Sequence, residues 1–335
     1  MARLIRNLAI ALAILLAGGY VAGSALVWDK LTKVNGECHP EWEANDPTKF
    51  EFEPPAPDAT PIPDALPVPS VDTAPYDMPA PEAVTFPSRD PAIQISGWWV
   101  AADDPSAPAV VVVHGHTACK RDPTVLLAAG MLHRAGFSAL LIDLRDHGDS
   151  IDEDGRYAGG TEEYRDVLGA WDWVQSAKGI APARIGLLGI SLGAATVLIA
   201  AGEEPRVVAT WEDSSYADIS VAIKAELRRN GYPEFLEAGG VAMAQLISGD
   251  DLHSRSPLMA VQKMGGRKLF ITHGTADERL SVQYAHDLIA AATASGVDLQ
   301  SWIVEGTSHT AAIRVVREEY EGRLDEFFRG ALSGN

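Results

Sequence analysis

The chain has 335 residues and carries 46 acidic against 27 basic side chains, so its formal net charge at pH 7 is -19. A protein this acidic repels phosphate backbones and anionic membrane surfaces, and we therefore expect no nucleic-acid partner. The length allows one large domain with additional segments. The two cysteines, Cys38 and Cys119, lack the C-x-x-C spacing of zinc and redox motifs and predict no metal site. They either pair, which requires an oxidising compartment, or remain as thiols.

Residues 1–30 are predicted to form a membrane anchor. Arg3 and Arg6 precede an apolar run over residues 8–28 that contains no charged side chain. About 20 such residues are enough for a helix to span a bilayer. A cleaved signal peptide is the alternative, because the small residues 22–24 (AGS) resemble a cleavage site. In both cases we expect the rest of the chain to be exported, either membrane-anchored with an extracytoplasmic domain or secreted.

Residues 31–81 are predicted to be an acidic, proline-rich linker. Over residues 51–81, prolines recur every few positions with little hydrophobic periodicity, which is typical of a semi-extended spacer. A ligand for a peptide-recognition domain is the alternative, but the basic residues that often flank such ligands are missing. The main domain then covers residues 82–335.

Strands and helices alternate through this domain. The segments AVTFPS and IQISGWWVAA are predicted strands that can pair as a hairpin, and residues 110–113 have the composition of a strand buried on both faces. Five further strands are expected in FSALLIDLR, RIGLLGI, VVATWED, KLFITHG and LQSWIVEG, with an irregular region over about residues 214–264. Helices between the strands predict a mostly parallel sheet covered on both faces, with ligands at the carboxyl ends of the strands.

A nucleophile is predicted at Ser191, within the G-x-S-x-G string GISLG. The serine follows a strand and precedes the helix-forming run AATVLIAA, which is the context that a nucleophile elbow requires. Side chains at Gly189 or Gly193 would crowd such a strained turn. The alternative interpretation is that these glycines only let a strand and a helix pack closely.

A serine nucleophile needs a base within hydrogen-bond reach, and the base needs an orienting acid. Asp277 follows the strand KLFITHG and His309 follows the strand in LQSWIVEG, so both are expected at the sheet edge that carries Ser191. Taken singly, His309 also suits a helix start and Asp277 a helix cap. Glu212 and Asp213, at the end of VVATWED, are the runner-up acids.

Acyl transfer also needs hydrogen-bond donors for the developing oxyanion. The backbone amide of Leu192 is one candidate, because free amides at a helix start favour negative charge. The second is expected in the loop HGHTACKRD, with the amide of His116 as first candidate. In the same loop, His114 and Gly115 also have structural interpretations, the histidine holding the loop and the glycine permitting a tight turn.

The remaining histidines predict neither a metal nor a catalytic site. None has a metal-binding partner at helical i, i+4 spacing. His133 and His286 fall inside predicted helices, His253 lies in the irregular region, and His273 precedes Asp277, where a structural hydrogen bond is favoured. We therefore expect no metal and no cofactor.

At these residues the chain resembles the α/β-hydrolase superfamily, especially its serine aminopeptidase-like and prolyl-oligopeptidase-like branches, from about Ala83 to the C-terminus. Five motifs in order carry the resemblance: VVVVHGH, DLRDHGDS, GISLGA, HGTADERL and GTSHT. It implies an α/β-hydrolase fold with Ser191 as nucleophile, Asp277 as orienting acid and His309 as general base, and the amides of His116 and Leu192 as oxyanion donors. One departure is Asp146, where many relatives have glycine in a turn that is usually structural.

The resemblance also implies a small helical lid at about residues 214–262. Ile219, Ile223 and Leu227 have helical spacing there, which more often indicates packing, although the inner face of a lid is where acyl-chain selectivity would arise. The sequence therefore predicts a serine hydrolase that cleaves esters or thioesters of a small-molecule acyl substrate. A peptidase or aminopeptidase of the same mechanism, and a tethered binding module without activity, are the alternatives.

Overall fold

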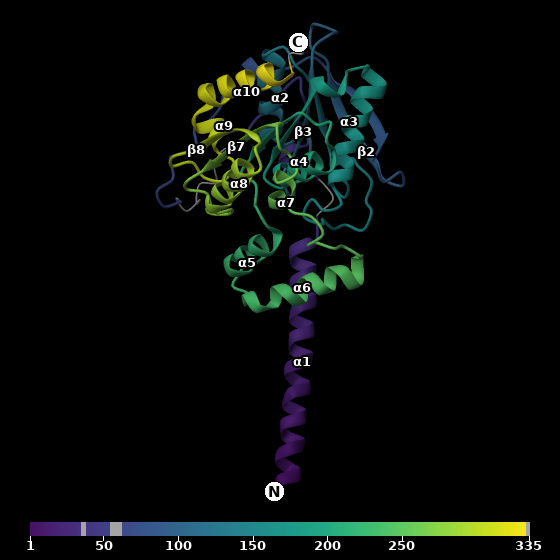
Figure 1. The fold of residues 1–335 in the computed structure, drawn as a ribbon, viewed down its shortest axis with the longest axis vertical. Coiled ribbons are helices and arrows are strands. Elements are labelled where there is room, and N and C mark those ends of the chain that lie inside the picture. Colours follow the sequence, from purple (N-terminus) through teal and green to yellow (C-terminus); the bar gives the residue numbers. More distant parts are fainter. Residues whose placement is uncertain (35–37, 54–61, 333–335) are drawn as a thin grey trace.

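A mostly parallel sheet of eight strands forms the centre of the protein in the computed structural model, which describes residues 1–34, 38–53 and 62–332 (Figure 1). The strand order is β1-β2-β4-β3-β5-β6-β7-β8. Strands β1 and β2 form the predicted antiparallel hairpin, β2 pairs antiparallel with β4, and all other neighbours run parallel. The strands are β1 Glu82–Pro87, β2 Gln94–Val100, β3 Ala109–Val113, β4 Ser138–Ile142, β5 Ile185–Ile190, β6 Ala209–Asp213, β7 Lys268–Gly274 and β8 Asp298–Val304.

Helices cover both faces of this sheet, as the alternating pattern predicts. On one face lie α3 (Tyr164–Lys178), α4 (Leu192–Glu203), α7 (Pro257–Val261) and α8 (Gln283–Ala294). On the other lie α2 (Pro123–Arg134), α9 (Ala312–Val315) and α10 (Arg317–Leu332). Strand β3 is buried along its whole length, with alternate valines in the two cores. This continuous burial explains why its sequence is an unbroken apolar run.

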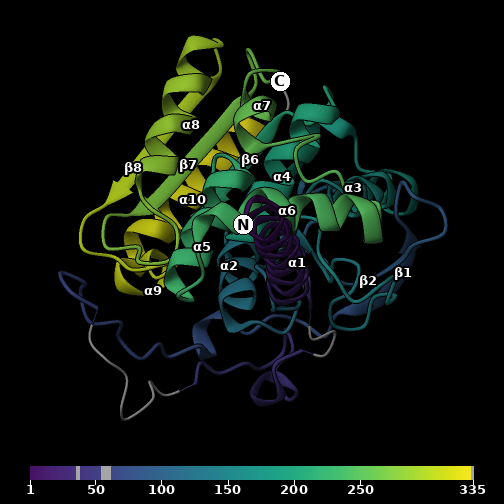
Figure 2. The same cartoon turned by 90° about the horizontal axis from the view of Figure 1, so that it is seen from below.

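The region expected to be irregular contains helices that meet the N-terminal helix. Helix α1 (Ala2–Thr32) projects from the domain as a stalk in Figure 1, and its side chains over residues 1–22 are all exposed. Where α1 enters the domain, it packs against α5 (Ile219–Arg229), the short helix η4 (Glu234–Leu236), α6 (Glu237–Met243) and, through α6, the π-helical turn η5 (Ala244–Ser248). Figure 2 looks along the stalk and shows α5 and α6 beside it.

The proline-rich segment is more than the spacer that its composition predicts. Phe50, Tyr76 and Met78 are buried in the same hydrophobic core as α2. The Thr73 hydroxyl donates a hydrogen bond to the Phe50 carbonyl at 2.5 Å. The described parts of the segment are therefore packed on the domain, because each of these large apolar side chains removes its surface from water. The remaining parts of the predicted linker, residues 35–37 and 54–61, lie outside the described residues.

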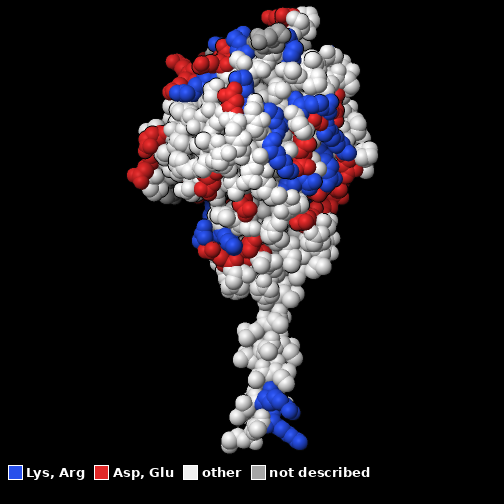
Figure 3. Space-filling model, viewed as in Figure 1, with Lys and Arg blue, Asp and Glu red and all other residues white. Residues whose placement is uncertain are grey.

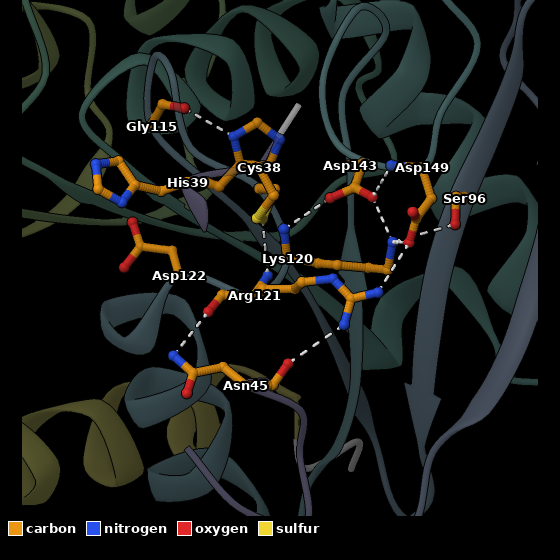
Figure 4. The surroundings of a disulfide bond; sticks show 12 residues. Cys38, His39, Asn45, Ser96, Gly115, Lys120, Arg121, Asp122, Asp143 and Asp149 are labelled. Carbon is orange, nitrogen blue, oxygen red and sulfur yellow. Dashed lines mark hydrogen bonds and ion pairs between the residues drawn. A yellow bond between two sulfur atoms is a disulfide. The ribbon is translucent and has the colours of Figure 1, made fainter. Parts of the chain in front are cut away.

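The two cysteines form a disulfide, which the sequence left open. Cys38 and Cys119 have their Cα atoms 5.5 Å apart. Figure 4 shows the neighbouring Lys120, whose buried ammonium group pairs with Asp143 and lies 2.6 Å from a carboxylate oxygen of Asp149. A buried ammonium group requires such partners. The bridge thus joins the segment after α1 to a rigid loop that follows β3.

Candidate active site

Ser191 lies on a strained turn between β5 and α4. Its φ angle is +57°, a region that side-chain-bearing residues rarely adopt. A Cβ atom on Gly189 would overlap with the carbonyl of Gly193, and one on Gly193 would overlap with the carbonyl of Val113. The Ser191 amide donates to the Asp213 carbonyl at 2.8 Å. Close backbone approach at this turn therefore leaves no room for a side chain at either glycine.

The structure brings His309 and Asp277 to Ser191. The distance from His309 Nε2 to Ser191 Oγ is 2.9 Å, and His309 Nδ1 lies 2.7 Å from Asp277 Oδ2. A carboxylate accepts hydrogen bonds, so Nδ1 carries the proton and Nε2 is free to accept from the serine hydroxyl. The three side chains follow β5, β7 and β8, whose carboxyl ends share one edge of the sheet.

The carboxylate of Asp277 is held from several directions. Its Oδ1 atom accepts from the backbone amides of Arg279 at 2.9 Å and Leu280 at 2.8 Å. Its Oδ2 atom also lies 3.1 Å from Nε2 of the buried His273. Burial by itself raises the pKa of Asp277, but the hydrogen bonds from His273 and His309 hold that pKa well below its usual range. Asp277 is therefore ionised and fixed in orientation.

His273 makes the structural hydrogen bond that the sequence favours, from Nε2 to the Leu280 carbonyl at 2.8 Å. Because a carbonyl only accepts hydrogen bonds, Nε2 carries the proton. The same N–H group also faces the carboxylate of Asp277. This second contact was not predicted. The histidine precedes the acid by four residues, which is the one sequence signal that points to it.

The runner-up acids have other partners. Asp213 accepts from the hydroxyls of Ser214 at 2.7 Å and Tyr320 at 2.9 Å. Burial raises the pKa of Glu212 to about 8, and one of its oxygens accepts from the amide of Ser215 at 3.0 Å. Among the described residues, Asp277 and not a runner-up acid supplies the carboxylate that His309 contacts.

The loop after β3 passes directly beside Ser191. A Cβ atom on Gly115 would lie 3.2 Å from Cβ of Ser191. His114 holds the loop, as its structural interpretation predicts: Nδ1 donates to the Gly115 carbonyl at 2.7 Å and Nε2 accepts from the Leu144 amide at 3.1 Å. Burial lowers the pKa of His116 to about 3, so this imidazole is neutral where it lines the site.

The departure at Asp146 is structural. Its φ angle is +61°, and its Oδ1 atom accepts from the backbone amides of Glu153 at 2.7 Å, Gly155 at 2.8 Å and Asp154 at 3.1 Å. Aspartate is among the residues that tolerate this backbone region. Three hydrogen bonds to its carboxylate therefore stabilise Asp146 in a backbone conformation that glycine adopts freely.

A pocket of about 120 Å³ opens beside Ser191. One side of the pocket is formed by Lys30 and Leu31 of α1 together with the inner face of α5. We call this side the outer wall, and its segments lie far apart in the sequence. Two of the predicted lid residues, Ile219 and Ile223, line the pocket, whereas Leu227 packs with Val27 of α1. The remaining lining residues are His116, Tyr157, Leu192, Tyr216, Ala222, Glu226, Arg279 and Leu280. Sequence reasoning missed Lys30, Leu31, Tyr157, Tyr216 and Arg279.

One group of possible metal ligands exists among the described residues, away from this pocket. Ligand atoms of His39, Glu41 and Glu53 lie within 4.8 Å of one another, and all three residues are exposed. Exposed acidic groups of this kind are common without a metal ion, so we assign it no role.

Comparison with known proteins identifies the family. The model of the prolyl oligopeptidase family matches residues 127–335, more than half of the chain. A thiohydrolase from Aspergillus aculeatus, aneE, is 32% identical over 102 residues, which are 30% of this chain and 32% of the relative. The chain spans less than half of the length of the curated relatives that it matches.

Solved structures share the fold. The esterase Pf2001 of Pyrococcus furiosus has a TM-score of 0.61 at 21% identity, over 79% of this chain and 97% of that chain. The acylaminoacyl peptidase of Pyrococcus horikoshii has a TM-score of 0.56 at 18% identity, over 76% of this chain and 42% of that chain. The protein thus has the predicted α/β-hydrolase fold, and it belongs to the prolyl oligopeptidase family.

Proposed function

We propose that the protein is a serine hydrolase that cleaves carboxylic esters or thioesters through an acyl-enzyme on Ser191. The observation that carries this proposal is the continuous hydrogen-bonded chain from Ser191 through His309 to Asp277. Such a chain activates a hydroxyl that is otherwise a weak nucleophile. The strained turn supports the same role, because strain of this kind concentrates at functional sites.

The mechanism follows from the tautomer of His309. Nε2 accepts the proton of Ser191 as Oγ attacks the substrate carbonyl carbon, and the resulting oxyanion accepts from the amides of Leu192 and His116. His309 then returns the proton to the departing alcohol or thiol, leaving the acyl-enzyme. Water attacks that ester with His309 again as base, which releases the acid and restores Ser191. Asp277 stays ionised throughout and stabilises the imidazolium.

The lining of the pocket favours an ester or thioester over a peptide with a free amine. Glu226 is a carboxylate at the pocket, but Lys30 and Arg279 line it as well. A substrate ammonium group would therefore meet two cations and one anion. The apolar side chains Ile219 and Ile223 suit an acyl chain instead. A peptidase of the same mechanism is the second candidate, because one structural neighbour is an acylaminoacyl peptidase.

We further propose that residues 1–30 remain attached as a membrane anchor with an extracytoplasmic domain. Ser24, inside the candidate cleavage site, is buried against α6, and Asp29 pairs with Arg156 at 2.9 Å. Cleavage at residues 22–24 would separate Ser24 from the helix that holds it against α6. It would leave Asp29 and the outer wall at a free N-terminal end of the chain, without the preceding turns of α1. The disulfide supports export, because such bonds persist in oxidising compartments. The division into anchor, segment 31–81 and hydrolase domain 82–335 is part of this proposal.

Labelling with a fluorophosphonate probe tests the mechanism. We expect the wild-type chain to label, and Ser191→Ala and His309→Ala to lose labelling. Ser220→Ala, which removes another serine from the lid, is the matched control and should label like the wild type. A folded wild-type chain that does not label would contradict the hydrolase proposal and favour the silent binding module. Rates with p-nitrophenyl esters, acyl thioesters and aminoacyl p-nitroanilides then separate the esterase from the peptidase.

A further inference from the structure

The outer face of α6 and η5 is apolar although it is exposed. Phe235 of the preceding η4 and Leu246 and Ile247 of η5 are 68%, 78% and 57% exposed, and the exposed Ala238 and Ala242 lie between them at helical spacing. The exposed Gln245 is uncharged. Helices that face water usually carry charged residues there. Within α6 and η5 the one charged residue, Glu237, is buried instead and lies 3.7 Å from the Lys224 ammonium group, while Glu234 of η4 pairs with Arg228 at 2.9 Å. The exposed face of α6 and η5 therefore carries no charged side chain.

The opposite face of α6 crosses α1. A Cβ atom on Gly239 would overlap with the side chain of Ser24, and one on Gly240 would lie 2.9 Å from Val27 Cγ1. Small residues thus bring the two helices together, as Figures 1 and 2 show. Close to this crossing, the rings of Tyr20 and Phe235 stack with centroids 6.3 Å apart. Aromatic rings are enriched at the level where a bilayer meets water.

The length of α1 sets how far the bilayer reaches. A hydrocarbon core needs about 30 Å of helix, or about 20 residues. After Arg6, only residues 7–22 are fully clear of the domain, and they supply roughly 24 Å. Hydrocarbon would thus extend roughly 6 Å further, to the level of residues 23–26, where α6 crosses at Ser24. Interfacial helices lie about 5–10 Å deep in the same boundary.

Charge follows the same geometry. In Figure 3 the stalk is free of charged side chains until its N-terminal end, where the blue side chains of Lys and Arg gather. The sequence has Arg3 and Arg6 there, and the next charged residue is Asp29. Basic side chains at this end can extend to the opposite membrane surface. The uncharged part of α1 and the outer face of α6 therefore form one continuous apolar surface.

We propose that the outer face of α6 and η5 rests in the surface of a lipid bilayer, so that the pocket beside Ser191 receives acyl esters dissolved in that surface. This inference rests on the proposed anchor and hydrolase functions. The pocket lies close to the membrane surface because Leu31 lines it, and Leu31 follows the α6 crossing by about one turn of α1. The proposed substrates are amphiphilic acyl esters whose chain partitions into lipid while the carbonyl stays at the surface.

Depth-dependent fluorescence quenching tests the contact in the full chain. Leu246→Cys and Met259→Cys each receive a bimane label with the native disulfide oxidised, and each protein is placed at one copy per phosphatidylcholine nanodisc. Met259 is the control because it is 45% exposed on α7, in the body of the domain. We expect doxyl lipid to quench the label at position 246 and aqueous iodide to quench the label at 259. Iodide quenching at 246 without lipid quenching would overturn the proposal, and so would shielding from both quenchers, which indicates a second copy on this face.

Activity on two substrates tests the consequence. For each variant we compare p-nitrophenyl palmitate dissolved in the bilayer with p-nitrophenyl acetate in water. Leu246→Glu should lower the ratio of the two rates about tenfold, because a carboxylate resists insertion, while Met259→Glu leaves the ratio unchanged. An unchanged ratio in Leu246→Glu would overturn delivery from the bilayer. Release of the chain by carbonate would overturn the anchor and this inference together, whereas loss of fluorophosphonate labelling concerns Ser191 alone.

Discussion

The nucleophile turn and the outer wall of the pocket are built on different principles. At the turn, two glycines and a strained serine lie within five residues, and the backbone packs so closely around the glycines that no further atom fits. At the outer wall, Leu31 and Ile223 come from helices almost 200 residues apart and contribute apolar side chains to the pocket lining. Apolar packing tolerates substitution, whereas a crowded backbone does not. We therefore expect the proposed reaction to depend on the crowded turn, where few substitutions fit, and substrate choice to depend on packing that tolerates substitution.

The largest expected effect is at the acid of the nucleophile site. Asp277→Asn should lower kcat for p-nitrophenyl butyrate by about 10⁴, because an amide favours the wrong tautomer of the histidine. Asp213→Asn is the matched control and should stay within about tenfold of the wild type, because Asp213 bonds Ser214 and Tyr320 instead. Equal losses in both variants would show that Asp213 shares the role assigned to Asp277. The measurement is steady-state hydrolysis with circular dichroism as the folding check.

The second effect concerns stability at the turn. Gly193→Ala should lower the free energy of unfolding by about 3 kcal/mol, because its Cβ would overlap with the Val113 carbonyl. Gly322→Ala in α10 is the control: no atom lies within 4 Å of its added Cβ, and we expect a gain of about 0.5–1 kcal/mol. Urea titration in detergent measures both. If Gly193→Ala is as stable as the wild type, the turn is less crowded than we infer.

The third effect is pH-dependent and lies behind the nucleophile. Burial raises the pKa of Glu212 from its ordinary value of 4.5 to about 8, so the folded state holds its proton more tightly than the unfolded state. Stability linked to this group is therefore complete below pH 4.5 and falls as pH rises toward 8. Glu212→Gln removes that loss, and its unfolding free energy should exceed that of the wild type by about 2 kcal/mol at pH 9.

The control for this prediction is Glu278→Gln, which changes an exposed carboxyl group. Its urea titration curves should run parallel to those of the wild type between pH 5 and 9, a range chosen to bracket the Glu212 transition. Only the difference between Glu212→Gln and the wild type should grow with pH. A difference that stays constant across this range would mean that Glu212 titrates as in the unfolded chain.

The fold and the convergence of Ser191, His309 and Asp277 at one edge of the sheet could be predicted because most of their signals are local. The apolar run of β3 and the spacing of GISLG each reflect a constraint within a few residues, burial on both faces in one case and backbone crowding in the other. Asp277 and His309 followed from their positions after two strands, since parallel strands end at one edge. These predictions needed no knowledge of how distant segments pack.

The outer wall and the packed linker could not be predicted because their signals are not local. Leu31 reaches the pocket only because α1 continues past its exposed apolar part and crosses α6, and no periodicity relates residue 31 to Ile223. Phe50 and Tyr76 are isolated apolar residues around a proline-rich segment, so no amphipathic pattern marks their burial. His273 was predicted to form a structural bond, but its contact with Asp277 depends on side-chain orientation in the turn.

The smallest expected effect distinguishes the outer wall from the nucleophile turn. Leu31→Ala and Ile223→Ala each remove apolar contact area from the pocket while leaving the hydrogen-bonded chain intact. We expect kcat/KM for p-nitrophenyl butyrate to fall about three- to tenfold and the preferred acyl chain to lengthen, because a few methylene contacts carry about 1–3 kcal/mol. The fluorophosphonate labelling rate should change less, since that probe reports on Ser191. Val221→Ala, an exposed change on the same helix as Ile223, is the control. If Leu31→Ala behaves like Val221→Ala, α1 does not contribute to substrate choice; if it behaves like Ile223→Ala, the anchor is part of the pocket.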